Sequence, residues 1–211
     1  MSAAANIYAQ RTSSILEFHS LVTHEVVKFH AFLTSFTETF ASSWNSEVVY
    51  GRNDPIGSFQ GTARTLSLGW DVPAGFLGEA KNNMESISLL TQMLYPGYTT
   101  ATVTVKQEGV GDMSVGSNAL SLSKPPLMRI KFANLIDDAA GRQNGLLGWV
   151  SSLSANPTLD MGMFTSVMDD GKLYPKVFAL SIQFNVLHEH DLGKTPGSKA
   201  FSNAPTFPFG G

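Results

Sequence analysis

The feature that most constrains the fold is a strict alternation near the end of the chain. In KVFALSIQFNV, residues 176–186, the even positions are apolar: Phe178, Leu180, Ile182, Phe184 and Val186. The polar positions between them include Ser181, Gln183 and Asn185. Side chains of a β-strand alternate between two faces, so this stretch predicts a strand with one buried face.

Several other stretches have strand patterns. In TARTLSLGWDV, residues 62–72, one face carries Leu66, Leu68, Trp70 and Val72. Less regular patterns lie at 27–33, 101–107, 127–136 and 146–154. Two long stretches, 107–126 and 156–175, contain many glycine, serine, proline or aspartate residues, which predicts loops. We expect Trp44 and Trp70 in the core, where tryptophan is usually largely buried.

A single long helix is predicted over about 74–94. Its apolar residues recur at helical spacing and form one stripe: Phe76, Leu77, Ala80, Met84, Ile87, Leu90 and Leu94. The sequence YPGY after it predicts its end. The chain therefore reads as mainly β, a β-rich α+β fold, with a domain at 26–193 between an N-terminal arm at 1–25 and a C-terminal arm at 194–211.

Composition narrows the class of function. Only 15% of the 211 residues are charged, below the usual quarter, which suggests that part of the surface is covered by other copies. The net charge of -3 argues against tight binding to nucleic acid. The absence of cysteine excludes disulfides and thiolate chemistry. We find no apolar run long enough for a membrane span and no signal-peptide pattern, so a cytosolic origin is expected.

The sequence LHEHDLG at 187–193 resembles a metal site, because His188 and His190 would share one face of a strand. Glu189 and Asp191 would lie on the opposite face, so only two ligands converge, whereas a catalytic metal normally has three from the protein. We predict a structural role for both histidines at the rim of the sheet. A metal-dependent β-barrel enzyme using them remains a distant alternative.

Other catalytic patterns are missing from the sequence. EGVGDMSVG lacks the lysine of a phosphate loop, and no G-x-S-x-G elbow occurs. The pairs Asp137–Asp138 and Asp169–Asp170 precede small residues, which favours solvated turns over an acid–base dyad. We therefore predict no catalytic residue, no cofactor and no metal, and a protein that is not an enzyme.

One stretch carries a family resemblance: WNSEVVYGRNDPIGSFQGTARTLSLGWDVPA, residues 44–74. It resembles the tail-tube initiator, or tube–baseplate junction, proteins of contractile-tailed bacteriophages, of the cyanophage and large myophage type. The resemblance continues through EAKNNMESISLLTQMLYPGY, LMRIKFANLI and LYPKVFALSIQFNVLHEHDLG, in the same order, over roughly 26–193. The two terminal arms lie outside it.

The resemblance implies a tail-tube fold, an antiparallel β-sandwich or partly open barrel flanked by one helix. Family members of this kind form a hexameric ring at the baseplate end of the tail tube. The implied partners are other copies of the chain, the tail-tube protein, and hub and wedge proteins of the baseplate. DNA would pass through the lumen without specific binding. The implied location is the virion tail, after assembly in the host cytoplasm.

Residue roles follow from the same resemblance. The loop around residue 50 would reach an adjacent subunit with Tyr50 and Phe59 as apolar anchors, Arg52 would bind Asp54, and Arg64 would pair with a nearby acid. Arg52 and Asp54 also fit an ordinary solvated turn. The polar face of the last strand, Ser181, Gln183 and Asn185, would line a hydrated channel, although it fits an outer surface equally well.

The C-terminal arm contains three phenylalanines, Phe201, Phe207 and Phe209, whose burial would stabilise by roughly 1.5–3 kcal/mol each. We expect this arm to dock on a neighbouring subunit. Two further alternatives stay open: the tail-tube subunit itself or its counterpart in a contractile injection system, and a carbohydrate- or peptide-binding module.

Overall fold

The computed structural model describes residues 15–30, 32–105, 113–138, 145–166, 171–189, 192–194 and 207–208, with backbone alone for 100–105 and 113–121. The elements in these ranges are β1 (Ile15–Ser20), β2 (Val26–His30), β3 (Phe32–Glu47), β4 (Ile56–Pro73), α2 (Leu77–Gln92), β5 (Gly97–Val105), β6 (Met113–Lys124), β7 (Met128–Phe132), β8 (Leu146–Pro157), the short 3-10 helix η1 (Leu159–Met161), β9 (Met163–Ser166), β10 (Lys172–Pro175) and β11 (Val177–Val186).

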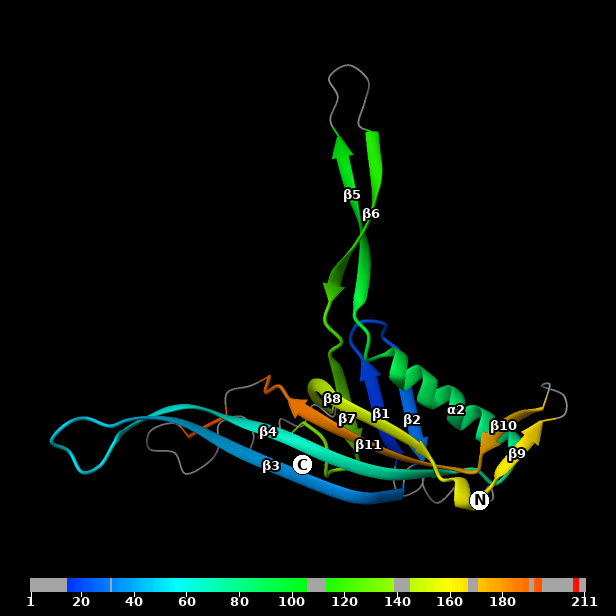
Figure 1. Cartoon of the computed structure of the whole chain (residues 1–211), viewed down its shortest axis with the longest axis horizontal. Coiled ribbons are helices and arrows are strands. Elements are labelled where there is room, and N and C mark those ends of the chain that lie inside the picture. The colour runs from blue at the N-terminus through cyan, green and yellow to red at the C-terminus, as the bar shows by residue number, and fades with distance from the viewer. Residues whose placement is uncertain are drawn as a thin grey trace.

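The largest unit is an antiparallel sheet of seven strands in the order β2-β1-β7-β8-β11-β4-β3 (Figure 1). Two hairpins, β9–β10 and β5–β6, form separate two-stranded sheets. The predicted mainly β fold with a single α-helix is thus confirmed for the described residues.

The sheet curls so that its two ends face each other across the core. Phe18 on β1 and Phe29 on β2 lie 5.8 Å and 5.9 Å from Trp70 on β4, measured between ring centroids. In the sheet order, β7, β8 and β11 separate β1 from β4, so only a curled sheet can bring these rings together. One curled sheet, open between β2 and β3, takes the place of two sheets packed face to face.

The alternation in β11 and β4 explains why this core forms. All five even positions of β11 are buried, and they pair with the buried face of β4: Phe178↔Val72, Leu180↔Trp70, Ile182↔Leu68 and Phe184↔Leu66. Each fully buried aliphatic or aromatic side chain contributes about 1.5–3 kcal/mol. The two most regular patterns in the sequence therefore become adjacent strands at the centre of the fold.

Helix α2 packs beside the open side of the core. It contacts β2, β9 and β10, and Ile87 and Leu90 belong to the buried cluster. The Glu79 carboxylate, in the first turn, accepts a hydrogen bond of 2.7 Å from the N–H of Gly75, which fixes the chain just before the N-cap residue Phe76. The helix predicted at about 74–94 is confirmed with slightly shorter bounds.

Two long hairpins project from the body, β3–β4 to the left and β5–β6 to the top in Figure 1. In the first, β3 pairs with β4 along its length, from Phe32↔Asp71 to Glu47↔Ile56. The turn is confined to residues 48–55, because backbone pairing continues out to Glu47 and resumes at Ile56.

Three parts of the sequence interpretation are wrong in detail. Residues 15–20, assigned to the N-terminal arm at 1–25, form β1, which lies inside the sheet between β2 and β7. The predicted loops at 107–126 and 156–175 contain β6, β9 and β10, which are held by pairing within hairpins. The strand predicted at 27–33 is divided between β2 and β3, which lie at opposite edges of the sheet.

Candidate functional site

The β3–β4 hairpin is the best candidate for a functional surface. Close to the body, its core-facing side carries Leu66 and Leu68, which are buried. Farther out, the same side continues through the paired residues Phe40 and Arg64 to the facing pair Trp44 and Phe59. We call the large exposed apolar side chains of this hairpin from residue 40 outward the hairpin strip; its members are Phe40, Trp44, Val48, Val49, Tyr50, Ile56 and Phe59.

Trp44 is exposed, and the prediction that it lies in the core is wrong. Its side chain is 62% exposed, because the hairpin extends past the core at this point. Its ring centroid lies 5.2 Å from that of Phe59 in an edge-to-face arrangement, and its Nε1–H donates a 2.9 Å hydrogen bond to Ser42 Oγ. The prediction for Trp70 is confirmed, since that side chain is fully buried.

The tip of the hairpin presents a fully exposed Tyr50 and a half-exposed Phe59. Both side chains are therefore accessible for contacts with another molecule. Arg52 and Asp54 are exposed as well, and among the described residues no hydrogen bond or ion pair joins them. The predicted link between Arg52 and Asp54 is absent, and in the isolated chain the two side chains are solvated, as in an ordinary turn.

Arg64 has the predicted acidic partner, which is Glu38 on β3. Its Nε–H donates to Glu38 Oε1, and the arginine is only 2% exposed. The guanidinium also lies 5.6 Å from the centroid of the Phe40 ring and 5.3 Å from that of Phe207. A guanidinium enclosed by a carboxylate and two aromatic rings is held in a fixed position where the hairpin leaves the body.

Phe207 in the C-terminal arm contacts its own chain. Its ring lies 5.9 Å from Phe40 and 6.4 Å from His188, and the carbonyl of Pro208 accepts a 3.0 Å hydrogen bond from Arg64. The arm was expected to dock on a neighbouring subunit, but Phe207 has a contact within its own chain instead. Phe201 and Phe209 lie outside the described residues.

The outer face of the sheet carries an uncharged polar band across four strands. Ser181, Gln183 and Asn185 lie on it, on the side of β11 opposite the core. Their neighbours on β4 and β8 are Gly69, Ser67, Thr65, Ser154, Ser152 and Trp149, and β3 adds Ser35, Thr37 and Thr39. We call this surface the polar band. Besides hydroxyl and amide groups it contains the indole of Trp149, and none of these residues is ionisable, although Asp71 follows Gly69 on the same face.

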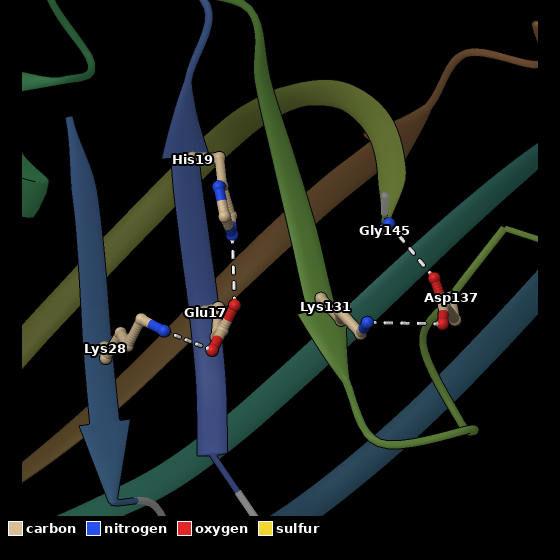
Figure 2. Close-up of polar contacts among 6 residues, drawn as sticks. All are labelled: Glu17, His19, Lys28, Lys131, Asp137 and Gly145. Carbon is tan, nitrogen blue, oxygen red and sulfur yellow. Dashed lines mark hydrogen bonds and ion pairs between the residues drawn. The ribbon is translucent and has the colours of Figure 1, made fainter. Parts of the chain in front are cut away.

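The outer face of β1, β2 and β7 is charged instead (Figure 2). The carboxylate of Glu17 lies 2.7 Å from Lys28 Nζ and 3.1 Å from His19 Nε2. Partial burial opposes ionisation of Glu17, but the hydrogen bonds from Lys28 and His19 outweigh it and hold its pKa below the usual value. This half of the sheet therefore differs sharply from the polar band.

A second ionic cluster supports the turn that follows β7. The predicted solvated turn at Asp137–Asp138 is wrong, because both residues are buried. Asp137 Oδ1 accepts a 3.0 Å hydrogen bond from the Gly145 N–H, and its other oxygen lies 3.7 Å from Lys131 Nζ (Figure 2). The aspartate thus organises a buried turn, and Asp169–Asp170 lie outside the described residues.

Glu189 pairs with Arg129 by two hydrogen bonds of 2.6 Å and 2.7 Å. The Glu189 hydrogen bond, working against partial burial, raises the pKa of Arg129. This fork joins β7 to the chain just after β11.

His188 does not continue β11, which ends at Val186. His188 is exposed at the rim of the sheet, and His190 lies outside the described residues. Within the described part of the chain, no group of three or more histidine, cysteine, aspartate or glutamate side chains is placed to hold a metal ion. In the same ranges, no helix has the length and apolar character needed to cross a bilayer.

The sequence did not predict that Glu38, Phe40 and Trp44 belong to the surface of the β3–β4 hairpin. A signal was present, because the even positions of 36–44 are Phe36, Glu38, Phe40, Ser42 and Trp44, a one-faced pattern. The turn-like residues that follow obscured it.

Comparisons with known proteins identify no relative: no family model matches the chain, and no curated protein matches it.

Proposed function

We propose that this chain is a structural, non-enzymatic component of a contractile phage tail. In this proposal it forms a ring, of hexameric symmetry by family resemblance, at the baseplate end of the tail tube. Support comes from the ordered motifs of residues 44–193 and from the mainly β fold with one helix beside a curled sheet.

The observation that carries the proposal is the hairpin strip. Seven exposed apolar side chains lie on one hairpin that extends beyond the core of its own chain. A group of exposed apolar side chains on an element that projects from the body favours a role as a protein contact. In addition, within the described residues the strand β3 pairs on one side only, with β4, so the other side has free backbone hydrogen-bonding groups.

A neighbouring copy would cover both features. If the hairpin of one subunit packs on the body of the next, each subunit buries its hairpin on one neighbour and part of its body under the hairpin of the other. Such head-to-tail contacts close into a ring when the rotation between subunits divides a full turn. Ring closure also removes exposed sheet edges, which otherwise promote aggregation.

The polar band supports an assignment of Ser181, Gln183 and Asn185 to the channel wall. A wall that binds DNA tightly needs cationic groups that displace counterions from the phosphates. The band has none, so DNA could move along it without being held. The charged outer face around Glu17 and Lys28 is then less suitable for the lumen.

The mechanism would be templating. A preformed ring presents a surface that matches the tail-tube subunit on one side and the baseplate hub on the other. The first layer of tube subunits would then add to an ordered surface, which avoids the unfavourable step of assembling a ring from single copies.

Electron microscopy of the purified chain, alone and mixed with tail-tube subunits of the same phage, tests this function. We expect rings from the chain alone and tubes that start from those rings in the mixture. Long tubes from the chain alone would indicate the tail-tube subunit itself. Single copies that leave tube formation unchanged would contradict the proposal.

A further inference from the structure

The contact between Arg64 and the C-terminal residues Phe207–Pro208 resembles the binding of a short peptide to a protein surface. Phe207 comes from the far end of the chain. The next residue, Pro208, is 144 positions away from Arg64 in the sequence. It covers a guanidinium that is otherwise bounded by Glu38 and Phe40. The contact is therefore made by a segment that is remote in sequence from the sheet that receives it.

The receiving surface has polar and apolar parts in fixed positions. Arg64 offers its face to the Phe207 ring at 5.3 Å and donates a 3.0 Å hydrogen bond to the Pro208 carbonyl. Beside it is a pocket whose apolar wall includes Leu146, Leu147, Val186 and Leu187. We call the surface formed by Phe40, Arg64, His188 and this pocket wall the Phe–Pro seat.

Each part of the Phe–Pro seat lies on or beside a strand of the central sheet. Phe40 is on β3, Arg64 on β4, Leu146 and Leu147 on β8, and Val186 at the end of β11. Because these residues are held by paired strands, we expect the surface to keep its shape when the segment leaves it. Two separate features are recognised: an aromatic ring over a cation, and the carbonyl group of the next residue.

We propose that the Phe–Pro seat is a binding site for the C-terminal segment of this chain, which it holds as a replaceable ligand. The segment occupies the seat from within its own chain, and the same segment supplied as a separate peptide competes for it. Occupancy connects the base of the β3–β4 hairpin to the end of β11, since Phe207 contacts both Phe40 and His188. The inference does not depend on ring formation or on a role in phage tails.

The test uses full-length chains and a fluorescent peptide of residues 201–211, with binding followed by anisotropy. In a Phe207→Ala chain the seat loses its internal ligand, so the peptide should bind. The wild-type chain should bind it at least about tenfold more weakly, because apparent affinity falls with the fraction of open seats. A peptide carrying Phe207→Ala should bind the Phe207→Ala chain at least about tenfold more weakly than the unchanged peptide.

Two controls locate the binding. Replacing both charged residues, Glu38→Leu with Arg64→Met, in the Phe207→Ala chain should abolish the gain in binding while leaving no unpaired buried charge. Adding Phe59→Ala should leave peptide binding unchanged, because Phe59 is an exposed aromatic residue of the same hairpin that faces Trp44.

Circular dichroism establishes that each chain is folded. If Phe207→Ala prevents folding, Phe207→Leu retains apolar volume but lacks the ring, and it should bind the peptide more tightly than the wild-type chain does. A folded Phe207 variant that binds no peptide would overturn the proposal. Equal binding of the normal and the Phe207→Ala peptide would overturn it as well.

Discussion

At the scale of single residues, the base of the β3–β4 hairpin contains a buried ion pair. Arg64 and Glu38 form an ion pair with side chains that are 1% and 8% exposed. Breaking such a pair is costly because one charge remains buried without a partner, whereas replacing both members with apolar groups is often close to neutral. Arg64 therefore fixes the geometry at the hairpin base without necessarily adding stability.

The first prediction concerns this pair. Arg64→Met alone should lower the free energy of unfolding by about 3–5 kcal/mol, since Glu38 is left buried without its cationic partner. The double variant Glu38→Leu with Arg64→Met should recover most of that loss. Urea unfolding followed by tryptophan fluorescence measures both. Equal losses in the single and double variants would show that the ion pair does not account for the effect.

The second prediction concerns pH and Glu17. Its pKa is lowered in the folded chain from the usual 4.5, because hydrogen bonds from Lys28 and His19 outweigh burial. A carboxylate with a lowered pKa stabilises the fold above its unfolded pKa, and this contribution is lost as the pH falls through the folded pKa. The wild-type chain should thus lose stability relative to Glu17→Gln below pH 4.5.

Urea unfolding of the two chains at a series of pH values provides the measurement. At neutral pH the difference between them should be constant. In a Lys28→Met background the difference should shrink, because the principal hydrogen-bond donor to Glu17 is gone. A difference that does not change from neutral to acid pH would refute the assigned role of Glu17.

The sequence predicted some residue environments well and others poorly. It predicted an acid partner for Arg64 and the burial of Trp70, and both are confirmed. It did not predict that Phe207 would cover Arg64, because that contact joins distant parts of the chain and leaves no local pattern. The burial of Asp137 was missed for a similar reason, since its partners Lys131 and Gly145 belong to different elements.

At the scale of elements, close contact between strands limits which residues fit. Gly148 on β8 lies opposite Val186 on β11, beyond the irregular pairing between Gln183 and Phe184. A Cβ atom at this glycine would lie 2.0 Å from the carbonyl oxygen of Asn185 and 2.8 Å from the Phe184 ring. The backbones of β8 and β11 can approach this closely only because the side chain is absent.

The third prediction follows from that contact. Gly148→Ala should destabilise the fold by about 1–3 kcal/mol or more, because β8 must move away from β11. Gly57→Ala is the matched control, since its Cβ would meet only the exposed Trp44 ring at 3.6 Å. Thermal unfolding compares the two, and a Gly148→Ala chain as stable as the control would contradict this packing.

The fourth prediction concerns the hairpin strip. Replacing Trp44 and Phe59 with serine should leave the unfolding temperature of the single chain nearly unchanged, because both side chains are exposed. Self-association should weaken by about 2 kcal/mol or more if these rings are central to a contact. Phe76 and Tyr95 are exposed aromatic residues outside the hairpin, and replacing them with serine provides the control. Equal effects of the two pairs on sedimentation would contradict the assignment.

Strand prediction succeeded where alternation was long and failed where it was short or disguised. The ten residues of β11 carry five buried positions, an unambiguous pattern. The six residues of β1 offer only Leu16 and Phe18 as buried apolar positions, too few to distinguish a strand from an arm. In β6, glycine and serine concealed a strand that depends on pairing with β5.

At the scale of the whole molecule, the fold consists of a buried core within a curled sheet and two hairpins that project from it. The core contains the aromatic contacts between β1, β2 and β4, and the β3–β4 hairpin carries exposed apolar side chains away from it. An isolated chain thus retains surface that a second copy would cover, which agrees with its low charged fraction of 15%. The order of strands could not be predicted from the sequence, because β2 and β3 are consecutive yet lie at opposite edges.

The most direct measurement of the central claim, that identical copies complete this molecule, is sedimentation velocity of the full-length chain over a wide range of protein concentration. The account predicts one closed oligomer that forms from single chains as concentration rises and then stops growing, with Trp44→Ser plus Phe59→Ser shifting its formation to higher concentration. A chain that sediments as a single folded copy at every concentration would contradict it.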